Sequence, residues 1–116
     1  MERYFFFDID GTLTTPLTAD YPDSAREAVR RLQEKGNFVA IASGRLQADA
    51  VDVAEELGID SVISDGGNGV TCCGKILYHE GLPLEDCFRL LGEIDGKKHP
   101  WAVTTENKKR RKTKYD

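Results

Sequence analysis

Three short apolar runs, separated by two amphipathic segments, are the feature that most constrains the fold of this chain. The runs cover residues 4–7, 38–42 and 61–64. Between them, residues 24–36 and 47–58 repeat apolar side chains at helical spacing, and each segment ends at a glycine. Strands that alternate with helices through short links are typical of right-handed crossovers in a parallel sheet. The sequence therefore predicts an α/β fold, a parallel sheet with flanking helices.

The pattern changes after Asp65. The letters DGGNG form a cluster of turn residues, and the next apolar runs, 70–73 and 76–78, are separated only by Gly74 and Lys75. Two such runs with a short glycine-containing link predict a β-hairpin. A further amphipathic helix around residues 84–91 and a strand at 101–105 follow. We place a boundary at Asp65, which divides the chain into residues 1–65, residues 66–107 and a basic tail at 108–116.

Composition restricts the class of protein further. A chain of 116 residues with 40% apolar side chains supports one compact domain. No run approaches the roughly 20 apolar residues of a membrane span, and the N-terminus lacks the features of a signal peptide. We therefore expect a cytoplasmic protein with no membrane partner. The three cysteines, with Cys72 next to Cys73, match neither a disulfide framework nor a zinc motif, and we expect reduced structural thiols.

Charge is distributed unevenly along the chain. Residues 1–96 carry a net charge of −10, whereas residues 97–116 carry +6 within a total of −4. The basic run Lys108–Lys114 could bind nucleic acid or phosphate, but such a run is more often a solvated terminal segment. No aromatic residues alternate with its basic residues to stack on bases. Nucleic acid is therefore not the partner we expect.

Two carboxylates and a hydroxyl follow the ends of predicted strands. Asp8 and Asp10 come directly after the first strand, and Ser43 comes after the second. In an open parallel sheet, ligands bind in the crevice beyond these strand ends. Carboxylates this close together favour a hard cation such as Mg²⁺, which would leave one able to attack and the other to transfer protons. Two alternatives remain for Asp8 and Asp10: ordinary turn residues, or a metal-binding Asp-x-Asp pair of the glycosyltransferase kind. Ser43 favours a phosphate site.

The strand ends also carry a family resemblance. FFFDIDGTL resembles the first motif of the haloacid dehalogenase-like hydrolases, an apolar strand running into Asp-x-Asp-Gly-Thr, and IASGR resembles the second. ISDGGNGV and KILYHEGLP are similar to the start of the cap domain in the Cof-type sugar-phosphate phosphatases of that family. The resemblance runs from about Arg3 to about Asp95. It implies a Rossmann-like core in residues 1–65, followed by the start of an α+β cap in residues 66–107.

The resemblance also implies roles for individual residues. Asp8 would be the nucleophile that forms an aspartyl phosphate, and Asp10 would be the general acid and base. Mg²⁺ would be held by the Asp8 carboxylate and the Asp10 backbone carbonyl. The substrate phosphate would contact Ser43, Gly44, Thr12 and Gly11. Together these roles predict a Mg²⁺-dependent phosphomonoester hydrolase that acts on small phosphorylated metabolites, sugar phosphates above all.

Three other polar residues are left outside these roles. Arg45 is either a helix-start residue exposed to solvent or a substrate contact, and the sequence leaves both readings open. His79 and His99 are expected on the surface.

Two motifs of the family are not found in this chain, namely a lysine that neutralises the phosphate and an acidic Gly-Asp loop that completes the metal site. The resemblance therefore implies the N-terminal half of such an enzyme. The alternative is a catalytically silent module that binds phosphate, metal or another chain.

The strands that pair with the far side of the first strand in this family would also be missing. Residues 4–7, which are apolar throughout and typical of a strand covered on both faces, would then form an open edge, and we expect self-association there.

Overall fold

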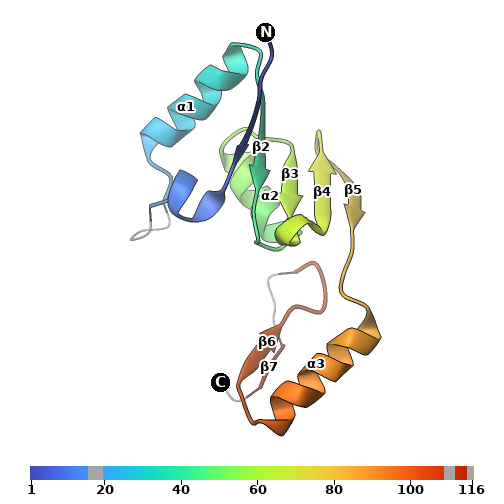
Figure 1. Cartoon of the computed structure of the whole chain (residues 1–116). Helices are drawn as coiled ribbons and strands as arrows, with labels where there is room; N and C mark the ends of the chain where they lie inside the picture. Colours follow the sequence, from blue (N-terminus) through green and yellow to red (C-terminus); the bar gives the residue numbers. More distant parts are fainter. Residues whose placement is uncertain (16–19, 109–111, 115–116) are drawn as a thin grey trace. The chain divides into compact units, whose positions relative to one another are not determined.

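The computed structural model describes residues 1–15, 20–108 and 112–114, the last three as backbone only. The chain divides into two compact units, Met1–His79 and Glu80–Asp116. Figure 1 shows the elements of both units.

A five-stranded sheet forms the first unit, with the strands in the order β1-β2-β3-β4-β5. The strands are β1 (Tyr4–Phe7), β2 (Phe38–Ala42), β3 (Val62–Ser64), β4 (Gly69–Cys72) and β5 (Lys75–His79). The first three strands are parallel, and the hairpin of β4 and β5 continues the sheet in the antiparallel sense. The predicted α/β class with a parallel sheet and flanking helices is confirmed.

Two helices connect the parallel strands, α1 (Asp23–Glu34) and α2 (Gln47–Glu56) (Figure 1). Two successive right-handed crossovers in the same direction place both helices against one face of the sheet. The core lies between that face and the helices. Its buried apolar residues are Ile9, Leu13, Val29, Val39, Ile41, Ala50, Val53, Ala54, Leu57, Ile59 and Val62.

The first strand is an edge of the described sheet, as the sequence predicted, but it is not covered on both faces. Phe5 and Phe7 pack against the core, whereas Tyr4 and Phe6 are 66% and 54% exposed. Tyr4 and Phe6 each lie against the Phe38 ring, with centroid distances of 5.6 and 6.2 Å. The expectation of two covered faces is wrong for the described residues because both helices pack on the side that carries Phe5 and Phe7.

The division between units falls after His79, not at Asp65 as the sequence predicted. The predicted hairpin exists, but it belongs to the core sheet because β4 pairs with β3 from Val62↔Thr71 to Ser64↔Gly69. The turn cluster after Asp65 reverses the chain without ending the sheet. The second edge of β3 would otherwise leave its backbone groups without sheet partners, and β4 provides them.

In its described residues, the second unit contains one helix and a pair of short strands. Helix α3 spans Leu84–Gly96, and β6 (Trp101–Val103) pairs antiparallel with β7 (Lys112–Lys114). The basic tail expected at 108–116 is thus not only a terminal segment, because three of its residues form a strand. No helix in the described ranges is long and apolar enough to span a membrane.

Candidate functional site

The turn after β1 leaves two carboxylates exposed between buried anchors. Ile9 is fully buried and Leu13 is 4% exposed, while Asp8 and Asp10 are exposed. Gly11 has φ +81°, a left-handed conformation that favours glycine, and its N–H donates to the Thr14 hydroxyl at 3.4 Å. The alternation of buried and exposed side chains along DID therefore places both carboxylates on the outside of the same turn.

A buried threonine, Thr14, closes this turn. Thr14 is buried, and both its backbone N–H and its hydroxyl donate to the Ile9 carbonyl, at 3.0 and 3.2 Å. Thr12, which the family resemblance assigned to phosphate binding, is exposed. Thr14 therefore stabilises the turn, and Thr12 presents its side chain to solvent.

Ser43 lies at the end of β2 and is fixed there by the neighbouring strand. Its N–H donates to the Ile63 carbonyl at 2.9 Å, which continues the parallel ladder beyond the last residue of β2. The side chain is buried, and its oxygen accepts a hydrogen bond from the Arg45 N–H at 3.0 Å. A serine hydroxyl that accepts one hydrogen bond still has its own hydrogen to donate. Gly44, the next residue, is exposed.

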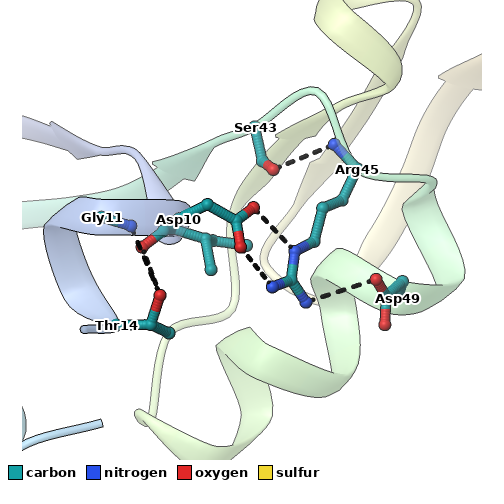
Figure 2. A network of polar contacts seen from close by, with 7 residues as sticks. Asp10, Gly11, Thr14, Ser43, Arg45 and Asp49 are labelled. Carbon is teal, nitrogen blue, oxygen red and sulfur yellow. Dashed lines mark hydrogen bonds and ion pairs between the residues drawn. The ribbon is translucent and has the colours of Figure 1, made fainter. Parts of the chain in front are cut away.

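Arg45 connects the two strand ends (Figure 2). Its Nε donates to Asp10 Oδ2 at 3.0 Å and its Nη2 to Asp10 Oδ1 at 2.5 Å, a bidentate arrangement, while Nη1 donates to Asp49 Oδ2 at 3.3 Å. Bidentate contacts of this kind fix orientation as well as adding attraction. Of the two readings that the sequence left open, the structure places Arg45 in contact with a site residue instead of only at a solvent-exposed helix start.

The ion pair sets the charge state of Asp10. Hydrogen bonding to the Arg45 guanidinium holds the pKa of the Asp10 carboxyl below its ordinary value, and Asp10 in turn raises the pKa of Arg45. Asp10 is therefore an ionised carboxylate at neutral pH. Asp8 differs, because its carboxylate makes no hydrogen bond or ion pair with any residue in the described part of the chain.

The residues that would hold a metal ion form only a partial set. Within the described ranges, no three His, Cys, Asp or Glu side chains lie close enough to hold an ion together. The Asp8 carboxylate and the Asp10 backbone carbonyl are hard oxygen ligands, which suit Mg²⁺. Because Mg²⁺ keeps several waters and is commonly bound through one or two carboxylates, these groups fit the ion but do not enclose it.

A second polar cluster lies at the end of β3. Asp65 Oδ2 accepts a hydrogen bond from the Gln47 N–H at 3.1 Å, at the start of α2, and lies 2.9 Å from His79 Nε2. The His79 side chain, which the sequence placed on the surface, is one-quarter exposed. Gly69 packs so close that a Cβ there would lie 2.3 Å from Ser64 Oγ. These contacts join the hairpin to α2 and hold the strand end in place.

Comparison with known proteins identifies similar chains. The sequence model of the haloacid dehalogenase-like hydrolases matches residues 5–114. "Putative phosphatase YkrA" of Bacillus subtilis (strain 168) is 39% identical over 105 residues, which cover 90% of this chain and 40% of that protein. A crystal structure from Geobacillus kaustophilus HTA426 is 37% identical, with a TM-score of 0.78 and coverage of 97% of this chain and 42% of that one.

A third similar protein indicates the subgroup of the haloacid dehalogenase-like hydrolases to which the chain is similar. The structure described as the HAD subclass IIB sugar phosphatase BT4131 is 26% identical, with a TM-score of 0.78 over 97% of this chain and 44% of that one. The resemblance drawn from the motifs of this sequence, including its Cof-type subgroup, is thereby confirmed. The chain spans less than half the length of each of these three relatives.

Proposed function

This chain belongs to the haloacid dehalogenase-like hydrolases, and from that premise we propose that it carries the nucleophile side of a Mg²⁺-dependent phosphomonoester hydrolase site. The observation that carries the proposal is the exposed Asp8 carboxylate beside a turn whose Asp10 is bound by Arg45 from the end of the next strand. Similarity to a described sugar phosphatase supports small phosphorylated sugars as the substrate class.

Each proposed residue has a definite step. An Asp8 carboxylate oxygen attacks phosphorus, the bond from phosphorus to the sugar oxygen breaks, and the Asp10 carboxyl gives its proton to that oxygen. Water then attacks the aspartyl phosphate, the Asp10 carboxylate accepts its proton, and phosphate leaves Asp8. Ser43, with Gly11, Thr12 and Gly44, would hold the phosphate oxygens. When bound, Mg²⁺ would offset the charge of the phosphate and of the carboxylates around it.

Arg45 gives the two halves of this reaction different requirements. Its bidentate contact favours ionised Asp10, which is the form that accepts a proton from water in the second half. Proton donation in the first half requires Arg45 to release the carboxyl group. Asp49, already 3.3 Å from Arg45 Nη1, offers the guanidinium another carboxylate when it does so.

A second function is a module that binds phosphate or metal without turnover. The observation that favours it is the missing third acidic side chain, since no three potential ligands gather anywhere in the described ranges. Both functions use the same residues, so they differ in whether a covalent phosphoenzyme forms.

Trapping that phosphoenzyme tests the proposal. The native protein is incubated with Mg²⁺ and hexose phosphates, quenched in acid, and searched by mass spectrometry for a phosphoryl group on Asp8. We expect an acid-labile adduct that Asp8→Asn abolishes, because an amide is a poor nucleophile. Asp23→Asn, on the exposed first turn of α1, is the matched control and should keep the adduct. Binding of phosphate without any adduct would favour the module.

A further inference from the structure

Two adjacent cysteines occupy the tip of the β4–β5 hairpin. Cys72 is the last residue of β4, and Cys73 and Gly74 form the two-residue turn before β5. Both turn residues have positive φ, +52° for Cys73 and +81° for Gly74. Two-residue hairpins favour turns with positive φ at both positions because their twist matches that of the strands.

This turn brings the two sulfur atoms together. In an extended strand, successive side chains point to opposite faces, so adjacent cysteines would hold their sulfurs apart. The left-handed conformation of Cys73 breaks this alternation, and the two sulfurs lie 3.7 Å apart. Non-glycine residues adopt that conformation rarely, and such residues cluster at functional sites.

The turn is held by the segment that precedes β3. The Cys73 N–H donates to the Ser61 hydroxyl at 3.2 Å, and the Gly74 N–H donates to the Asp60 carbonyl at 2.8 Å. Ser61 is itself buried, and its hydroxyl donates to the Asp60 carboxylate at 3.2 Å. The position of the two thiols is therefore set by the sheet and by these hydrogen bonds.

The distance between the two sulfurs suits two thiolates that share a metal ion and does not suit a disulfide. With zinc–sulfur bonds of about 2.3 Å and tetrahedral angles, two thiolates on one ion lie about 3.8 Å apart, close to the 3.7 Å between these sulfurs. A disulfide needs sulfurs at about 2.05 Å and Cα atoms usually at least about 4.4 Å apart, whereas Cα atoms of adjacent residues lie about 3.8 Å apart. The geometry therefore favours an ion between the two sulfurs over a bond that joins them.

We propose that Cys72 and Cys73 form a surface dithiol site that chelates a thiophilic divalent cation of the Zn²⁺ or Cd²⁺ class. Cys73 is exposed and Cys72 is partly exposed, so an ion can reach both sulfurs from solvent. The Asp60 carboxylate accepts the hydrogen bond of the Ser61 hydroxyl that binds the Cys73 N–H, and its negative charge favours a cation near this turn. Because no group of three potential ligands exists in the described ranges, water or small solutes complete the coordination. The site shares no residue with the proposed phosphatase.

Binding involves proton release and no change of oxidation state. A free cysteine thiol is mostly protonated at neutral pH, and it binds a metal ion as the thiolate. Each sulfur loses its proton as it bonds to the ion, and two protons are released for each ion bound. The proton count thus distinguishes a two-sulfur chelate from an ion held by one thiol or by carboxylates.

Cadmium titration of the native protein tests the site. The protein is reduced with a phosphine, and Cd²⁺ binding is followed by thiolate-to-cadmium charge-transfer absorption and by proton release at constant pH. We expect one ion per chain and two protons per ion. Cys72→Ser and Cys73→Ser should each weaken binding by about 10²-fold or more, because the second sulfur then no longer binds at high effective concentration. Cys87→Ser is the matched control and should leave affinity unchanged.

Two results would overturn the proposal. One is a Cys72→Ser/Cys73→Ser double variant that binds Cd²⁺ with the wild-type affinity and absorption. The other is wild-type binding that releases a single proton and is no tighter than that of either single variant. Amide NMR spectra of each variant, which report the β3–β4 ladder, separate a lost ligand from a lost fold.

Discussion

Replacing Arg45 by glutamine measures what the contact with Asp10 contributes to the fold. The bidentate ion pair joins the turn after β1 to the start of α2, 35 residues along the chain. The Asp10 side chain is 63% exposed and that of Arg45 is 26% exposed, so solvent screens the pair substantially. Exposed pairs typically contribute about 0.2–1 kcal/mol, and bidentate geometry places this one toward the upper end.

A double-mutant cycle isolates the interaction from other effects of each substitution. Arg45→Gln, Asp10→Asn and the double variant are unfolded in urea at pH 7, with the NMR signals of Val39–Ile41 reporting the first unit. We expect a coupling free energy of about 0.5–1 kcal/mol. Arg45→Lys keeps the charge without the planar fork and should recover only part of it. Arg45→Gln also removes the contact with Asp49. This loss occurs in both the single and the double variant, so it cancels in the coupling free energy.

The same cycle has a definite pH dependence. Because the folded-state pKa of Asp10 is lowered, its contribution is fully present above the unfolded-state value of about 3.9. The coupling should fade as the pH falls through the lowered folded-state pKa, and Arg45→Gln should raise that pKa. Salt at about 1 M should also reduce the coupling free energy, because it screens the two charges. A coupling near zero at pH 7, or one of equal size at pH 2 and pH 7, would refute the reasoning.

Three further predictions concern the site and the first strand. In any form of the protein that turns over, Ser43→Ala should lower turnover about 10²- to 10³-fold by removing the hydrogen bond that we propose Ser43 donates to the phosphate, and unchanged kinetics would exclude Ser43 from the site. Residues 1–116 alone should hydrolyse p-nitrophenyl phosphate barely above background, and robust EDTA-sensitive turnover that Asp8→Asn abolishes would show that the chain supplies the missing groups. Phe6→Lys on the exposed face of β1 should reduce self-association in sedimentation, whereas Leu84→Lys on α3 should not; a monomeric wild type would contradict the open edge.

Local pattern was enough to predict most of the first unit. The three parallel strands, the two helices between them and the hairpin all follow from the spacing of apolar residues and from turn residues. The sequence predicted the position of three site residues, because one apolar run stops directly before Asp8 and Asp10 and another directly before Ser43. The structure places them after the ends of β1 and β2. The DIDGT motif identified the family because its residues are contiguous in the sequence.

Contacts between distant residues decided the rest. Whether the hairpin opened a new unit or extended the sheet depended on which strand offered β4 its hydrogen bonds, and β3 did so. Which face of β1 was covered depended on where both helices packed. Nothing in the spacing of Arg45 and Asp10 predicted that they pair. The distance between the sulfurs of Cys72 and Cys73 depended on the backbone dihedral angle at Cys73. Sequence periodicity reports how each segment meets water, whereas pairing between segments is set by the packing of the whole unit.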